Sequence, residues 1–334
     1  MPLTMPIEHN LACLAKLTPS LRYDGAQPFD IWQKLAYARL WELLGMDSFT
    51  RCEPQFAAEE SVEYPDHTRT RFTFRSEEGY TVPGWWCVPN TGAASYPVMI
   101  CLQGHSTGMH QSLGECKFPR DEEGLKGDRD YAIQALAHGC AALVLEQRNF
   151  GECGSRPEGN PDCHRSTMAA LLQGRTTIGE RVWDVMRAID LLGSYLPNAD
   201  VSRVFCMGNS GGGTATFYAT CLEPRISAAM PSCAICSYDA SIAPIGHCVC
   251  NHIPRIRQYF DMGDLGGLIA PRPLVVVAGA LDSIFPIEPT RETFALIKKM
   301  YAAAGAGSRC ALHVGAGGHA FYPGAWGEFE RLTA

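Results

Sequence analysis

Residues 203–222 read RVFCMGNSGGGTATFYATCL, and this stretch decides the fold. Its first part is an apolar run ending at Met207, which predicts a strand buried on both faces. Its last part carries apolar residues at helical spacing and stops before Pro224, so a helix is expected there. The glycines around Ser210 predict a sharp turn that joins the strand directly to the helix.

A serine on such a turn presents its hydroxyl beside the first amides of the following helix, where developing negative charge is stabilised. Ser210 lies in the G-x-S-x-G pattern of residues 208–212, and a second match at 104–108 is centred on Ser106. Ser106 enters a polar loop without helical period, so no helix amides are expected to face it. Ser210 is therefore the predicted nucleophile, with the amide of Gly211 as one oxyanion donor.

The rest of the chain alternates short apolar runs with helical patterns, which predicts a doubly wound, mostly parallel α/β sheet. The expected buried strands are 97–102, 140–146, 203–208, 226–231, 273–279 and 310–314. The expected helices between them are 130–139, 179–196, 212–222 and 292–305. We expect one α/β-hydrolase domain over residues 1–334, in which an insertion at 232–270 partly caps the site.

The N-terminal part precedes this core. Residues 1–60 are expected to form a helical extension, with a helix at 28–45 whose apolar face would carry Ile31, Leu35, Ala38 and Leu43. Residues 69–76 and 81–89 alternate in polarity around the turn at Glu78 and Gly79, which predicts an antiparallel hairpin.

A serine hydroxyl needs a base to take its proton, and that base needs a carboxylate to orient it. Asp282 follows the expected strand 273–279, and His319 follows the last expected strand after two glycines. Both are thus predicted at the carboxyl end of the sheet, in the chain order serine, acid, histidine. Other candidates fit less well, because they precede or lie inside strands: Asp261, Asp264 and His313.

The loop after residues 97–102 is expected to supply the second oxyanion amide, from the backbone N–H of His105. Five further residues are predicted to support the site or line the substrate pocket. They are Gln103, Gly104, Asn209, Glu146 and Arg148.

Composition limits the partners. A net charge of −7 argues against nucleic acid and anionic membranes, and no apolar run is long enough to cross a bilayer. The first 18 residues lack a secretion pattern, so we expect a cytoplasmic protein whose 15 cysteines are reduced. The expected partner is a small-molecule ester; a homo-oligomer remains open, and no cofactor is predicted.

Several motifs together resemble bacterial α/β-hydrolases close to the acetyl xylan esterases and dienelactone hydrolases, over roughly residues 70–325. They are LQGH at 102–105, QRNFGE at 147–152, GERVWD at 179–184, GNSGG at 208–212 and APRP at 270–273. Gln103 stands where relatives carry histidine. The resemblance implies a cofactor-free serine esterase that acts on short acyl groups, often acetyl esters of carbohydrates, through an acyl-enzyme.

Other interpretations stay open at this point. The same triad would serve a peptidase or a lactone hydrolase, and the fold could belong to a non-catalytic binding protein. A zinc-dependent hydrolase is a further hypothesis, but the Cys and His spacing within 233–252 fits no standard zinc motif, so no metal is predicted. Trp85, Trp86 and Trp183 are expected in the core rather than in a sugar subsite.

Overall fold

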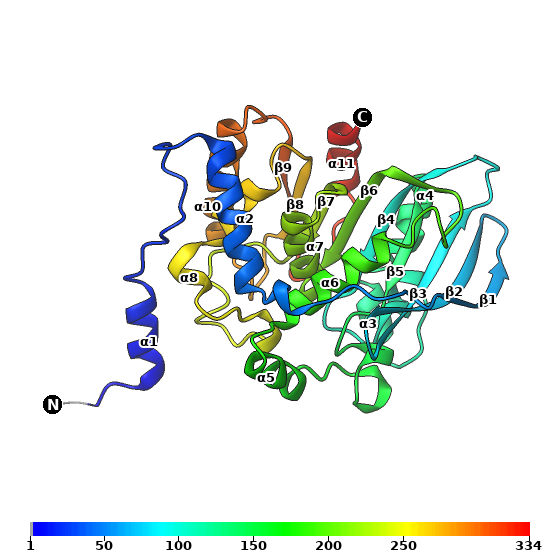
Figure 1. Cartoon of the computed structure of the whole chain (residues 1–334), viewed down its shortest axis with the longest axis horizontal. Coiled ribbons are helices and arrows are strands. Elements are labelled where there is room, and N and C mark those ends of the chain that lie inside the picture. The colour runs from blue at the N-terminus through cyan, green and yellow to red at the C-terminus, as the bar shows by residue number, and fades with distance from the viewer. Residues whose placement is uncertain (1–2) are drawn as a thin grey trace.

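A nine-stranded sheet forms the centre of the computed structural model, which describes residues 3–334 (Figure 1). The strand order is β1-β2-β3-β5-β4-β6-β7-β8-β9. The bounds are β1 Ala57–Glu63, β2 His67–Glu77, β3 Tyr80–Pro89, β4 Tyr96–Leu102, β5 Ala141–Leu145, β6 Ala199–Asn209, β7 Ile226–Ser232, β8 Leu274–Gly279 and β9 Cys310–Gly315. Strands β1, β2, β3 and β5 pair antiparallel, and all pairs from β5 to β9 are parallel.

The parallel register brings the carboxyl ends of the central strands to one edge. Leu102 of β4 is level with Gly208 of β6, and Gly279 of β8 is level with Gly315 of β9. Loops that leave these strands therefore meet above the same edge, where open α/β sheets place their ligands.

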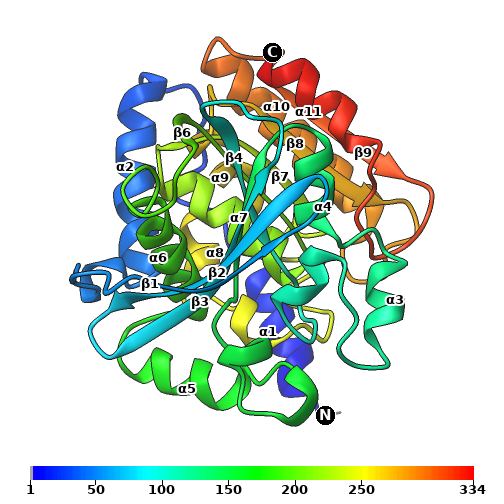
Figure 2. The same cartoon turned by 90° about the vertical axis from the view of Figure 1, so that its right-hand side faces the viewer.

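Helices cover both faces of the sheet. On β4, Val98, Ile100 and Leu102 pack into one core and Met99 and Cys101 into the other, because neighbouring strand residues point to opposite faces. The first core includes residues of the helices α2 (Phe29–Leu43), α6 (Thr177–Ile189), α7 (Gly211–Leu222) and α10 (Ile287–Ala303). The second includes residues of α4 (Tyr131–Ala137) and α11 (Ala325–Thr333). Figure 2 shows α2 and α6 on one side of the sheet and α4 and α11 on the other.

The helix bounds follow the chain. The α-helices are α1 Pro6–Leu14, α2 Phe29–Leu43, α3 Asp121–Leu125, α4 Tyr131–Ala137, α5 His164–Leu172, α6 Thr177–Ile189, α7 Gly211–Leu222, α8 Ile256–Tyr259, α9 Met262–Leu265, α10 Ile287–Ala303 and α11 Ala325–Thr333. The 3-10 helices are η1 Met46–Ser48, η2 Met109–Leu113, η3 Gly151–Cys153, η4 Pro157–Gly159, η5 Val249–Asn251 and η6 Gly266–Leu268. No helix among residues 3–334 has both the length and the apolar character needed to cross a lipid bilayer.

The predicted α/β fold is confirmed, and the hairpin is formed by β2 and β3. The predicted face of α2 was wrong for Ile31, Leu35 and Ala38, which are exposed, and confirmed for Leu43, which is buried. Ile31 and Leu35 are about half exposed, whereas the bulkier Trp32 and its helical neighbours Ala36, Leu40 and Leu43 are buried. The indole of Trp32 offers more apolar area than Ile31 and also donates to the carbonyl of Leu21 over 2.8 Å, so the helix rotates to bury it.

Two long segments between strands, residues 103–126 and the insertion at 232–270, are folded and contain short helices. In the first, Asp121 is fully buried and accepts hydrogen bonds from Thr107, from His110 at 2.8 Å and from the amide of Phe118 at 2.8 Å. Burial raises the pKa of this carboxyl, but the hydrogen bonds outweigh it and hold the pKa well below its usual value. An ionised Asp121 thus fixes the loop that follows β4.

Candidate active site

Ser210 occupies the turn between β6 and α7 with φ 57° and ψ −123°, a backbone conformation that side-chain-bearing residues rarely adopt. Its N–H donates to Ser232 on β7 at 2.9 Å, and its carbonyl accepts from Thr214 at 2.8 Å. These bonds tie the turn to the sheet on one side and to the helix on the other. The hydroxyl is consequently held at the amino end of α7, whose dipole favours negative charge.

His319 and Asp282 lie in hydrogen-bond contact. Nδ1 of His319 is 2.8 Å from one carboxylate oxygen of Asp282, and the other oxygen accepts from the amides of Ile284 at 2.9 Å and Phe285 at 3.0 Å. Burial raises the pKa of Asp282, but the bond from His319 and the two amide bonds lower it further, so the net pKa lies below its ordinary value. The ring of Phe285 lies nearly parallel to the imidazole, with the ring centroids 5.9 Å apart.

One cavity of about 290 Å³ is lined by both Ser210 and His319. Gly104, His105 and Gly211 also line it, so the predicted nucleophile, the predicted base and both predicted oxyanion residues share one space. Arg129 contributes a guanidinium to the wall.

The loop after β4 passes directly against the Ser210 turn. A Cβ on Gly104 would lie 2.6 Å from the carbonyl oxygen of Asn209 and 2.9 Å from Cβ of Ser210, so only glycine allows this approach. The imidazole of His105 packs on Gly211, where a Cβ would come within 3.0 Å of Nδ1. The amide of Gly211 begins α7 and so precedes the helix's own hydrogen-bond ladder.

Of the five predicted supporting residues, Gly104 lines the cavity, and the other four lie around the site without lining it. The side-chain amide of Gln103 donates to Ser112 and to the carbonyl of Arg129, both at 2.8 Å, which joins two loops. Asn209 accepts from the hydroxyl of Ser232 at 2.9 Å and so buttresses the turn.

Arg148 belongs to a buried ion network beneath the site. Its guanidinium makes two bonds to Asp184, at 2.8 and 2.9 Å, contacts Glu77 at 2.8 Å, and lies over the ring of Tyr80. It forms no ion pair with Glu146 among residues 3–334. The role of Arg148 in this geometry is to join β2, α6 and the loop after β5.

Glu146 is buried behind the site and accepts from the amides of Met109 at 3.1 Å and Glu152 at 3.3 Å. Its second oxygen has no partner among the described residues. Burial raises the pKa of Glu146 from 4.5 to about 7, against the lowering effect of the two amides.

Arg129 was missed by the sequence analysis. It donates to the carbonyl of His319 at 3.1 Å, while its buried Nε has no partner among the described residues. Arg129 comes from a short polar stretch before α4, and no spacing or motif there distinguishes it from an ordinary surface arginine. Only the packing of that stretch against the loop of His319 brings it to the cavity.

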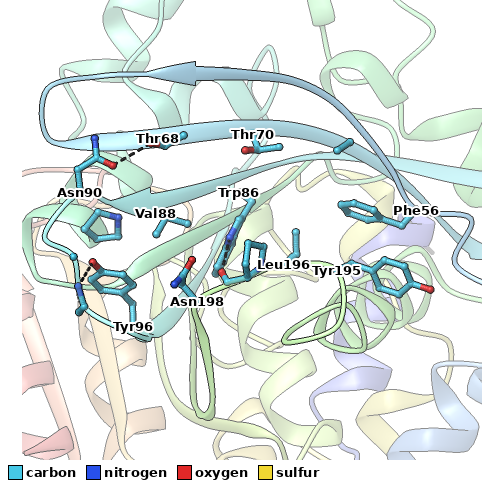
Figure 3. Close-up of a pocket in the computed structure, with 15 residues that line it drawn as sticks. Phe56, Thr68, Thr70, Trp86, Val88, Asn90, Tyr96, Tyr195, Leu196 and Asn198 are labelled. Atoms are coloured by element: carbon cyan, nitrogen blue, oxygen red, sulfur yellow. Dashed lines mark hydrogen bonds between the residues drawn. The ribbon is translucent and has the colours of Figure 1, made fainter.

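A larger cavity of about 680 Å³ lies elsewhere, beside the antiparallel strands (Figure 3). Figure 3 shows Trp86, Tyr96 and Tyr195 around it, and it includes none of the predicted catalytic residues. Trp86 and Trp183 are buried and hydrogen-bonded to backbone carbonyls, as expected for core residues. None of the three tryptophans lines the Ser210 cavity.

The Cys and His residues of the 232–270 insertion do not gather as one group. His247 contacts the hydroxyl of Ser241 at 3.0 Å and the carbonyl of Ile284 at 3.1 Å. Cys233 lies beside Asp282 and His319. Cys248 and Cys250 point instead toward His105.

The fold is that of the α/β-hydrolases, as comparison with known proteins shows. No family model matches the chain. A curated relative, "Putative hydrolase YtaP" of Bacillus subtilis, is 23% identical over 226 residues, which cover 67% of this chain and 73% of the relative.

Three solved esterase structures share the fold at 16% sequence identity. A "putative acetyl xylan esterase" of Bacteroides fragilis superposes with a TM-score of 0.79 over 94% of this chain and 83% of its own. A glucuronoyl esterase of Solibacter usitatus gives 0.68 over 95% and 98%. Acetyl xylan esterase 1 of Thermoanaerobacterium gives 0.62 over 98% of both chains. The sequence resemblance to this group is thereby confirmed.

The raised pKa of Glu146 makes the stability of the protein depend on pH. Between about pH 4.5 and 7 the folded protein holds a proton that the unfolded chain releases, so this carboxyl lowers the free energy of unfolding as pH rises. The loss amounts to about 3 kcal/mol across that window. Glu146→Gln should remove this pH dependence. In urea titrations at a series of pH values, the difference in unfolding free energy between variant and wild type should therefore change by about 3 kcal/mol across the window. The exposed Glu292→Gln serves as the control and should follow wild type, and a Glu146→Gln protein that also follows wild type would contradict the assignment.

Proposed function

We propose that this chain is a serine hydrolase that cleaves carboxylic esters, with Ser210 as nucleophile, His319 as base and Asp282 as the acid that orients it. The observation that carries the proposal is the 2.8 Å contact between His319 and Asp282 in loops that share a cavity with a serine on a strained turn. A serine and a histidine paired with a buried carboxylate in this order form the machinery of acyl transfer.

The reaction follows from these groups. His319 takes the proton of Ser210 as the hydroxyl oxygen attacks the ester carbonyl carbon, and Asp282 stabilises the imidazolium. The amides of Gly211 and His105 bind the oxyanion. His319 then gives the proton to the leaving alcohol, and an acyl-enzyme remains. Water, deprotonated by His319, attacks this ester, and the acid leaves as the Ser210 hydroxyl is restored.

The substrate class rests on the size of the cavity and on the relatives. A volume of about 290 Å³ favours a short acyl group such as acetyl. The polar wall at Arg129 and His247 suits an oxygen-rich alcohol such as a carbohydrate. The relatives named hydrolase, acetyl xylan esterase and glucuronoyl esterase point to the same chemistry. No cofactor is part of this mechanism.

Removing the nucleophile tests the proposal. Ser210→Ala should lower kcat on p-nitrophenyl acetate and on acetylated xylo-oligosaccharides by several orders of magnitude, because no other hydroxyl occupies the turn. Ser106→Ala is the matched control, since Ser106 is the central serine of the second G-x-S-x-G pattern, and it should keep kcat within a few-fold of wild type. Near wild-type turnover by Ser210→Ala would refute the assignment. The same panel should include aminoacyl amides and lactones. A preference for either of these over acetyl esters would show that the proposed substrate class is wrong.

The acid can be tested separately. Asp282→Asn removes the charge that orients His319 while keeping the size of the side chain, so kcat should fall by roughly 10⁴ with little change in folding. Turnover of p-nitrophenyl acetate and the far-UV circular dichroism spectrum measure the two quantities. Asp261→Asn, a substitution at one of the other candidate acids, is the control. Because Asp261 caps α9, this variant is expected to lose a modest amount of stability. Unchanged kcat in Asp282→Asn would exclude it as the acid.

A further inference from the structure

Four side chains of the types that can ligate a metal ion meet beside the Ser210 cavity, although they come from distant parts of the sequence. His105 comes from the loop after β4 and Cys163 precedes α5. In the insertion, Cys248 directly precedes η5 and Cys250 lies within it. Their ligand atoms all lie within 4.8 Å of one another. Nε2 of His105 is 3.2 Å from the sulfur of Cys250 and 3.8 Å from that of Cys163.

These separations match the edges of a tetrahedral zinc site. Zinc bonds of about 2.3 Å to sulfur and about 2.0 Å to nitrogen place neighbouring ligand atoms about 3.5 Å to 3.8 Å apart. The two nitrogen-to-sulfur distances, 3.2 and 3.8 Å, lie on either side of the expected value of about 3.5 Å. Three cysteines and one histidine are a ligand set of structural zinc sites, which have no open position for water.

The charge around the cluster provides a second observation. Arg181 is buried, with 2% of its surface exposed, and it donates to the sulfurs of Cys250 at 3.6 Å and Cys163 at 3.7 Å. It also donates to a backbone carbonyl and stacks on Phe150, but it forms no ion pair with a carboxylate among residues 3–334. A buried cation needs a counter-charge. Zinc with three thiolates and a neutral histidine carries a net charge of −1, which would neutralise Arg181.

We propose that His105, Cys163, Cys248 and Cys250 bind one zinc ion as a structural site. The ion links the loop after β4, the start of α5 and the insertion, a region whose own apolar cluster contains only Phe150 and the cysteines. This set differs from the one considered in the sequence, because His247 and His252 are outside it and Cys163 is 85 residues from Cys248. Sequence spacing could not have joined them.

The same ion would steady the oxyanion loop. Zinc on Nε2 would fix the imidazole of His105, whose other nitrogen lies against Gly211. The backbone amide of His105 would then be held beside Ser210. This role depends on the proposed function, whereas metal binding itself does not.

Metal content of the purified full-length protein tests the proposal. We expect about one zinc ion per chain by plasma mass spectrometry, and after replacement with Co²⁺ a spectrum with thiolate charge-transfer and tetrahedral d–d bands. Cys163→Ser and Cys250→Ser should each lower zinc content at least tenfold. His247→Asn, in the same insertion, and Cys310→Ser, a buried cysteine on β9, are matched controls that should keep it. Ser210→Ala should also keep the ion, so failure of the esterase proposal is distinguishable from failure of this one.

Three results would overturn the site. One is protein prepared under reducing conditions that contains no zinc and takes up neither Zn²⁺ nor Co²⁺. Another is a disulfide among the three cysteines, seen as 13 rather than 15 alkylated thiols in the denatured protein. The third is zinc that persists in both cysteine variants. If those variants do not fold, the Co²⁺ spectrum of wild type decides, because it reports thiolate ligands directly.

Discussion

The strained backbone of Ser210 is the constraint on which the rest of the site depends. A residue with φ 57° and ψ −123° is stable only when its surroundings hold it there, at a cost of order 1–3 kcal/mol. The hydrogen bonds to Ser232 and Thr214 do so, and so does the close approach of the loop after β4. Any residue larger than glycine at Gly104 would push that loop from the turn, so the turn and the loop after β4 are fixed together.

The other loops reach this turn because of strand order rather than sequence proximity. Strands β4, β6, β8 and β9 end at one edge, so the loops bearing His105, Asp282 and His319 converge there. Each loop is then tied down by its own polar contacts: Asp121 anchors the first, the amides of Ile284 and Phe285 hold the second, and Arg129 bonds the third. The loops around Ser210 are thus held by polar contacts of their own, and the proposed stabilisation of an oxyanion requires such a preorganised site.

The sequence predicted those features that depend on local pattern. Apolar runs located the strands of the parallel sheet, and the glycines around Ser210 located the turn. Predictions from the sequence failed where tertiary packing decides which residues are buried and which loops meet. Trp32 outweighed Ile31 and Leu35 in setting the face of α2, and the short polar strand β1, exposed along its whole length, has no apolar alternation to reveal it. The position of Arg129 beside the cavity and the proximity of His105 to Cys163 both depend on loops that pack against each other. Residue spacing along the chain does not reveal such packing.

The central claim is that Ser210 is the one activated hydroxyl of this chain, and covalent trapping tests it most directly. Wild-type protein treated with a fluorophosphonate should gain a single adduct, and peptide mapping should place it on Ser210 within residues 203–222. An adduct on Ser106, or no adduct on folded protein, would contradict the account.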